Sequence, residues 1–166
     1  MRKVSFRYGS LGLLVIVLLS ALSMSILGCD HQYSEAAGYL TILLSMVFVF
    51  FGLRHFRNEV NGGYLSFGQG LKVGGLIVLV PAVGFGLFDI LYTRVINPSW
   101  SANYTAKMTA NMDAAQKEAF AKQMALFSNP LFEFALMTAT VLIVGVIVTI
   151  ISTLALMRKP KGEFVV

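Results

Sequence analysis

Hydrophobic residues are grouped along the chain in four long stretches that are separated by polar segments. The stretches cover about residues 10–28, 36–53, 73–93 and 131–157. An α-helix rises about 1.5 Å per residue, so stretches of this length are typical of helices that cross a hydrocarbon core of about 30 Å. We therefore expect four membrane-spanning helices in a single integral membrane domain over residues 1–166.

The longest polar region lies between the third and fourth stretches. Asp113 and Gln116 have the spacing of a helix start, and apolar residues follow them at helical intervals. This pattern predicts an amphipathic helix over residues 114–127, which would lie on the membrane surface, cap the bundle or dock a partner. The expected fold class is an all-α membrane protein, a four-transmembrane-helix bundle with an additional amphipathic helix in the loop between spans 3 and 4. The apolar side of the predicted amphipathic helix is formed by Ala119, Phe120, Met124 and Phe127.

The segment between the second and third stretches carries both a helix stop and a helix start. Asn61, Gly62 and Gly63 tolerate the left-handed conformation that ends a helix. Ser66 and Gln69 have the spacing of a capping box, in which each side chain bonds the backbone N–H of the other residue. We expect one helix to end just before Asn61 and the next to begin just after Ser66, as antiparallel neighbours.

Small residues and one proline mark the third stretch. Ser66, Gly70 and Gly74 recur at every fourth position, which places them on one helix face. In lipid such faces let two helices approach closely. Pro81 removes a backbone N–H and predicts a bend or local unwinding of the same helix.

The first stretch permits two interpretations. It follows the basic residues Arg2, Lys3 and Arg7, which suits a permanent helix but also a signal sequence. Residues 26–30, ILGCD, resemble a lipoprotein cleavage box in which Cys29 would carry a lipid. The apolar stretch exceeds the roughly 7–15 residues of a signal peptide, and Leu27 replaces the usual small residue, so the retained helix is favoured. Fatty-acid labelling that is lost in Cys29→Ala would establish the lipoprotein interpretation.

The composition and the distribution of charge agree with a membrane protein. Hydrophobic residues make up 57% and charged residues 13% of the chain, which is too apolar for an ordinary soluble domain. The net charge of +5 comes from basic residues beside the apolar stretches, which indicates contact with lipid and excludes a nucleic-acid partner. Segment 30–37 has no Lys or Arg, whereas both tails and segment 54–72 are basic. We therefore expect both termini in the cytoplasm.

A few charged residues within or beside the stretches are candidate functional or lipid-contacting residues. Asp89 lies inside the third stretch, and an intramembrane carboxylate is by default a functional candidate. Its place near the outer end, close to Arg94, favours a structural ion pair over an ion or proton pathway. Glu133 lies near the outer end of the fourth stretch. The candidates for contact with lipid head groups on the cytoplasmic side are Arg54, Arg57 and Lys72.

One segment also carries a family resemblance. The sequence NGGYLSFGQGLKVGG, from Asn61 to Gly75, opens the third stretch, and a later Asn-Pro and a last stretch closed by Arg-Lys complete the order. In these features the chain resembles a family of small four-span bacterial inner-membrane proteins classed as a domain of unknown function, with an NGG-x-x-SFG motif before the third span. The resemblance covers most of the chain. It implies a multi-pass protein of the bacterial inner membrane with a retained first helix, and it implies no ligand or catalytic residue.

The sequence lacks the motifs of common hydrolases and metalloproteases and has one cysteine. We expect no enzymatic activity, catalytic residue, bound metal or cofactor. Two hypotheses for the function remain. The first is an accessory or interaction protein that contacts membrane lipids, other membrane proteins or further copies of itself. The second is a minimal oligomeric transporter or channel that uses Asp89 and Glu133; one shallow acid supplies little for a polar pathway, so the first is favoured.

Overall fold

The computed structural model describes residues 1–26 and 31–159, without the side chains of residues 31–35. Within them the chain forms six α-helices and two short π-helical segments. Four helical rods, namely α1, α2 with η1, α3 with η2, and α6, are long and apolar enough to cross a membrane, which confirms the predicted fold class. The elements are α1 (Arg2–Ile26), α2 (His31–His55), η1 (Phe56–Val60), α3 (Phe67–Leu91), η2 (Tyr92–Ile96), α4 (Trp100–Met108), α5 (Ala114–Leu126) and α6 (Pro130–Leu156).

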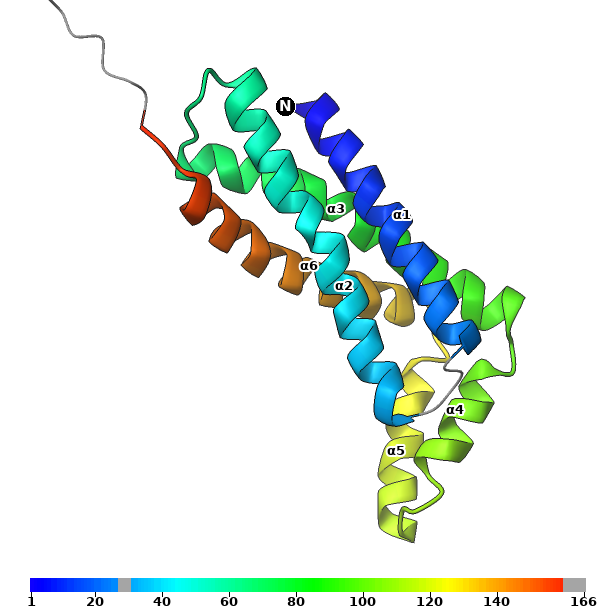
Figure 1. The fold of residues 1–166 in the computed structure, drawn as a ribbon. Helices are drawn as coiled ribbons and strands as arrows, with labels where there is room; N and C mark the ends of the chain where they lie inside the picture. Colours follow the sequence, from blue (N-terminus) through cyan, green and yellow to red (C-terminus); the bar gives the residue numbers. More distant parts are fainter. Residues whose placement is uncertain (27–30, 160–166) are drawn as a thin grey trace, which may run out of the picture.

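The four long helices form a bundle, and α4 and α5 project from one end of it (Figure 1). We refer to α4 and α5, residues 100–126, as the α4–α5 hairpin. The N-terminus, the connection between η1 and α3, and the end of α6 all lie at the opposite end of the bundle (Figure 1). Helix α3 is central to the packing because it contacts α1, α2 and α6.

Local hydrogen bonds define the predicted helix starts. The Ser66 hydroxyl accepts from the Gln69 backbone N–H at 3.3 Å, and the Gln69 side chain accepts from the Ser66 N–H at 3.1 Å. Gly62 and Gly63 have φ values of +61° and +86°, in the left-handed region that glycine adopts most easily. The start of α5 has a capping box of the same kind, formed by Asp113 with the third residue of the helix. The predicted capping box at Ser66 and the predicted helix start at Asp113 are therefore confirmed.

Small residues let α3 and α6 pack closely, as the sequence predicts. A Cβ atom added to Gly70 would collide with the side chain of Thr153, and one added to Gly74 would collide with Thr149. Ser66, expected on the same face, is instead exposed, and its side chain caps α3. Close approach increases dispersion contacts between helices, which is a main source of helix association in lipid.

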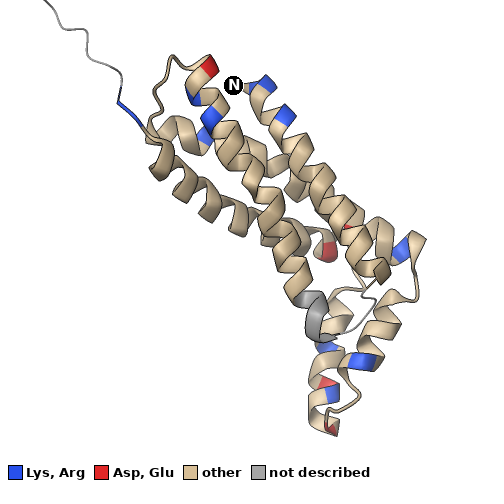
Figure 2. Ribbon diagram, viewed as in Figure 1, with Lys and Arg blue, Asp and Glu red and all other residues tan. Residues whose placement is uncertain are grey.

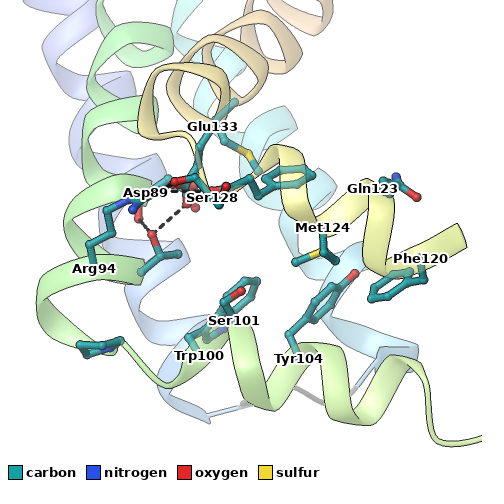
Figure 3. Close-up of a pocket in the computed structure, with 14 residues that line it drawn as sticks. Asp89, Arg94, Trp100, Ser101, Tyr104, Phe120, Gln123, Met124, Ser128 and Glu133 are labelled. Atoms are coloured by element: carbon teal, nitrogen blue, oxygen red, sulfur yellow. Dashed lines mark hydrogen bonds and ion pairs between the residues drawn. The ribbon is translucent and has the colours of Figure 1, made fainter. Parts of the chain in front are cut away.

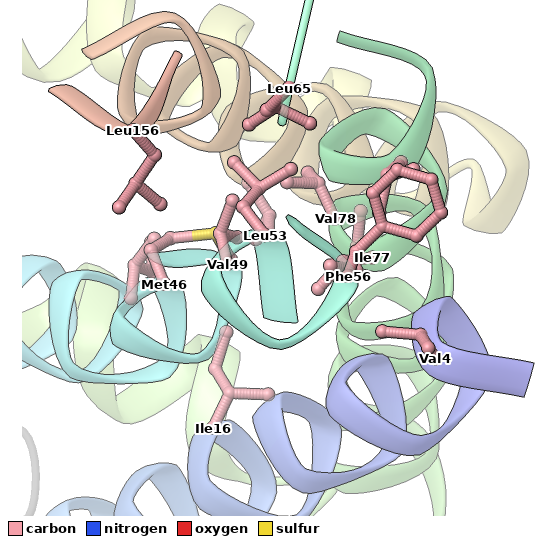
Figure 4. Close-up of a cluster of buried hydrophobic side chains, with 14 residues drawn as sticks. Val4, Ile16, Met46, Val49, Leu53, Phe56, Leu65, Ile77, Val78 and Leu156 are labelled. Atoms are coloured by element: carbon pink, nitrogen blue, oxygen red, sulfur yellow. The ribbon is translucent and has the colours of Figure 1, made fainter. Parts of the chain in front are cut away.

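The interior of the bundle holds one apolar cluster together with several buried Ser and Thr side chains. Two of these hydroxyls donate to backbone carbonyls on neighbouring helices, Ser5 to Val73 at 3.3 Å and Ser45 to Gly12 at 2.8 Å. The buried hydroxyls of Thr138, Thr149 and Thr153 on α6 have no hydrogen-bond partner in the described residues. The buried cluster includes Val4, Ile16, Met46, Val49, Leu53, Phe56, Leu65, Ile77, Val78 and Leu156 (Figure 4).

The outer surface of the bundle is also apolar. Large side chains such as Leu18, Leu43, Leu87 and Ile143 are exposed on the four long helices. Exposing so large an apolar surface to water would be unfavourable, whereas lipid chains solvate it. The backbone N–H and C=O groups are paired within each helix, as a membrane-spanning segment requires. The chain is therefore a small multi-pass membrane protein.

The first two helices begin earlier in the chain than the predicted spans. Helix α1 begins at Arg2 instead of near residue 10, because Val4 and Ser5 are already buried in the bundle. Helix α2 begins at His31 instead of near residue 36. Cys29, for which the lipoprotein interpretation was considered, lies outside the described residues.

The third span also differs from its prediction. Pro81 lies inside α3, which continues as an α-helix on both sides, so of the predicted bend or local unwinding the unwinding is wrong, and the bend stays a prediction. Pro81 is buried near Gly12 of α1, and packing of this kind holds a proline-containing helix together in a bundle. The segment after η2 holds a further helix, α4, which is not among the elements predicted from the sequence.

Candidate functional site

The α4–α5 hairpin meets the end of the bundle at a cavity of about 590 Å³, which we call the hairpin cavity. Its lining comes from the end of α3 with η2, from both helices of the hairpin and from the start of α6 (Figure 3). The polar side of the cavity includes Asp89, Thr93, Arg94 and Glu133. Three charged residues that the sequence singles out as candidates are thus brought together here.

An ion pair joins η2 to α6 at the base of the cavity. Arg94 donates from Nη2 to Glu133 at 3.0 Å and from Nε to the same carboxylate at 3.3 Å. The Arg94 guanidinium also donates to the backbone carbonyls of Phe127 and Ser128, both at 3.1 Å. Thr93 donates to the second oxygen of Glu133 at 2.9 Å. Both carboxylate oxygens of Glu133 therefore have donors, and the group is 5% exposed.

The predicted pairing of Asp89 with Arg94 is wrong. Both side chains line the hairpin cavity, but the Arg94 guanidinium, in the π-helical segment η2, is directed to Glu133 and to the backbone carbonyls of Phe127 and Ser128. Arg94 instead meets Glu133 because the first turn of α6 lies against η2. Asp89 is 6% exposed, and its carboxylate makes no hydrogen bond or ion pair within the described part of the chain.

Aromatic side chains form the wall of the cavity on the side of the hairpin. The rings of Trp100 and Tyr104 stack at 5.1 Å with an angle of 7°, and Tyr104 lies 6.5 Å from Phe120 of α5. Trp100 Nε1 is buried without a hydrogen-bond partner in the described residues. Phe120, Met124 and Phe127, predicted on the apolar side of an amphipathic helix, all line this cavity. Ala119, predicted on the same side, is exposed and does not line the cavity, so α5 meets the end of the bundle through part of its apolar side only.

The remaining charged candidates lie at the opposite end of the bundle, where Lys and Arg residues are concentrated (Figure 2). Arg54 and Lys72 are exposed there. Arg57 is buried, and it donates to the Asn58 side chain at 2.8 Å and to the carbonyl of Leu156 at 3.3 Å. Arg57 thus stabilises the end of α6, where free carbonyls attract a cation.

Arg54 and Arg57, both predicted as candidates for contact with lipid head groups, consequently do not share an exposed face. Arg54 lies in α2, whereas Arg57 lies in the last turn of this rod, which is π-helical from Phe56. Leu65 and Arg158 close the same end of the bundle with a reciprocal pair of backbone hydrogen bonds, both 3.1 Å long. The connection between η1 and α3 is thereby tied to the end of α6.

Two residues of the cavity were identifiable only in part from the sequence. Trp100 and Tyr104 are four residues apart, a spacing that places two rings on one side of a helix, and Pro98 shortly before them suits a helix start. These signals point to α4, but not to the cavity that its aromatic side lines.

Comparison with known proteins gives one family match. Residues 7–158 match the family described as "Protein of unknown function (DUF4199)". Comparisons with curated proteins and with solved structures gave no match.

Proposed function

This chain belongs to the DUF4199 family, whose description assigns no activity, and we propose that it is an accessory protein that contacts other membrane proteins through its α4–α5 hairpin. The observation that carries the proposal is the exposure of the hairpin. Both α4 and α5 extend beyond the bundle, and neither contains a buried residue (Figure 1). A structured helical extension that adds no buried core is suited to an interaction surface.

The exposed side of α5 has charges of both signs. Lys122 and Glu118 form an ion pair of 2.8 Å whose side chains are 76% and 70% exposed, so the pair contributes little to folding. Lys117 lies one residue before Glu118 and is exposed as well. Such residues can be replaced without disturbing the bundle, which makes this surface accessible to experiment.

The bundle interior argues against a transport pathway through one copy of the chain. Asp89 and Glu133 are the two acidic side chains buried among the described residues, and both lie at the hairpin end. Beyond them the buried side chains are apolar residues such as Ile77, Val78 and Val141 together with uncharged Ser and Thr side chains, and the next buried charge is Arg57 at the opposite end of the bundle. A polar path would need groups along the whole thickness of the membrane.

We place the protein in the bacterial inner membrane with both termini in the cytoplasm. The basic residues at the start of α1, at the end of α2 with η1, near the start of α3 and just after α6 gather at one end of the bundle, and this supports the proposal (Figure 2). Cytoplasmic segments of membrane proteins carry an excess of Lys and Arg. The α4–α5 hairpin would then face away from the cytoplasm.

Cross-linking in cells tests the proposed function. We expect a defined cross-linked complex with the tagged protein that is lost when Lys117 and Lys122 are both changed to Gln. The matched control is Lys159→Gln, which removes an exposed positive charge at the opposite end of the bundle. Reciprocal purification through the identified partner must recover the protein. Equal complex formation by the double variant would contradict the proposal, and a complex made only of this chain would replace it by self-association.

Transport is the second candidate function, and the absence of any partner for the buried Asp89 carboxylate in the described residues favours it. Reconstitution into proteoliposomes under a cation or proton gradient tests it. Flux above that of empty vesicles, lost in Asp89→Asn, would support transport. Flux equal to empty vesicles would exclude it.

A further inference from the structure

We propose that the hairpin cavity binds a small organic cation, an ammonium group on an aromatic or apolar body, with Asp89 as its counter-ion. The proposal does not depend on the hairpin contacting a partner protein. It starts from the volume of about 590 Å³, which falls within the range of about 300–1,000 Å³ typical of small-molecule sites.

Of the three charged side chains at the cavity, Arg94 and Glu133 pair with each other, and Asp89 has no opposite charge beside it in the described residues. Arg94 is the single Lys or Arg side chain among the residues that line it, and its donors are directed to Glu133 and to two backbone carbonyls. Glu133 is matched in turn by Arg94 and Thr93. Asp89 lies beside this network with no donor of its own in the described residues (Figure 3). An ionised carboxylate in such a place is costly unless it is paired, so a ligand that brings a positive charge would be stabilised there.

The opposite wall suits the rest of such a ligand. Trp100, Tyr104 and Phe120 present aromatic surfaces to the cavity, and Met124 adds a polarisable thioether. Aromatic faces attract cations and also cover apolar groups, a combination used for ammonium ligands. The buried Nε1 of Trp100, which has no acceptor among the described residues, offers a hydrogen bond to a polar atom of the ligand.

Other ligand classes fit less well. Two carboxylates at the base oppose an anion. A hard metal cation takes about six to eight oxygen ligands, whereas Asp89 is the single carboxylate of this cavity that is not already engaged. The described residues also contain no group of three His, Cys, Asp or Glu side chains arranged to hold a metal.

Trp100 provides the readout because the chain has one tryptophan. The full chain, in nanodiscs of phosphatidylglycerol, which has no ammonium group, is titrated with benzylammonium, benzyl alcohol and benzoate while Trp100 fluorescence is followed. We expect saturable binding of benzylammonium at least tenfold tighter than binding of the neutral alcohol, and no saturable binding of benzoate. Asp89→Asn should weaken benzylammonium binding at least tenfold. Glu59→Gln, which changes an exposed acid at the other end of the bundle, should leave the affinity within twofold.

The source of the ammonium group is resolved by a second titration. Nanodiscs that also contain phosphatidylethanolamine supply a lipid amine. Weaker apparent binding of benzylammonium in these nanodiscs would identify a lipid head group as the ligand, whereas unchanged affinity would identify a free amine.

Equal affinity for benzylammonium and benzyl alcohol would overturn the proposal, and this comparison uses the unchanged chain, so it does not depend on the folding of a variant. Absence of saturable benzylammonium binding, or an unchanged affinity in folded Asp89→Asn, would overturn it as well. None of these results would affect the cross-linking test of the hairpin.

Discussion

Arg94 and Glu133 lie 39 positions apart in the chain, yet they form the ion pair that holds the start of α6 against η2. The pair is half-open to solvent: the Arg94 side chain is 38% exposed and that of Glu133 is 7% exposed. Its contribution should therefore fall between that of surface pairs, about 0–1 kcal/mol, and the loss of about 3–5 kcal/mol when one partner of a buried pair is removed.

Replacing Glu133 by Gln tests the energetic role of this pair. The change keeps the size of the side chain but removes its charge, so Arg94 loses its counter-ion. We expect the free energy of unfolding, measured by SDS titration with circular dichroism, to fall by about 1–2 kcal/mol. The control is Glu118→Gln, whose pair with Lys122 is highly exposed, with an expected change below about 0.5 kcal/mol. Equal changes in the free energy of unfolding for the two variants would show that the Arg94–Glu133 pair stabilises the fold no more than an exposed ion pair does.

At the scale of elements, hydropathy and capping predict most of the fold. The four long helices follow from stretches of apolar residues, and the starts of α3 and α5 follow from Ser66 and Asp113, because these signals are local in sequence. Helix α4 lacks such a pattern, because its nine residues, WSANYTAKM, are mostly small or polar. The π-helical turns η1 and η2 have no local signal that we recognise.

The candidate site was predictable in its residues but not in its arrangement. Asp89, Arg94 and Glu133 could each be identified from the sequence alone, because each is a charged residue within or beside an apolar stretch. Which acid meets Arg94 depends on the packing of α6 against η2, a tertiary contact that the sequence pattern does not encode locally. The same holds for Trp100 and Phe120, which line one cavity from two different helices.

The contact between α3 and α6 gives a prediction at this scale. Gly74→Ala would force a Cβ into the side chain of Thr149, whereas Gly75→Ala, one residue on, meets no atom within 4 Å. We expect Gly74→Ala to lower the free energy of unfolding by about 1–3 kcal/mol. Gly75→Ala should be neutral or stabilising by up to about 1 kcal/mol, because alanine favours a helix. SDS titration of both variants measures the difference. A destabilisation by Gly75→Ala as large as that by Gly74→Ala would contradict close packing as the cause.

The whole molecule has two unlike ends. One end holds both described chain ends and most of the basic residues, and the other holds the α4–α5 hairpin and the hairpin cavity (Figures 1 and 2). A bundle with this polarity fits a membrane in which one side supplies an anionic surface and the other supplies the ligand or partner. With the proposed orientation, we expect both the proposed interaction surface and the proposed cation site on the side away from the cytoplasm.

Cysteine accessibility tests this orientation most directly. In a Cys29→Ala background, single cysteines replace Glu59, exposed at the basic end, and Lys117, exposed on the hairpin. Intact cells are treated with a membrane-impermeant maleimide, and permeabilised cells show that each cysteine can react. We predict labelling of the Lys117→Cys protein from outside and labelling of the Glu59→Cys protein only after permeabilisation. Labelling of both positions from outside, or of Glu59→Cys alone, would contradict the account.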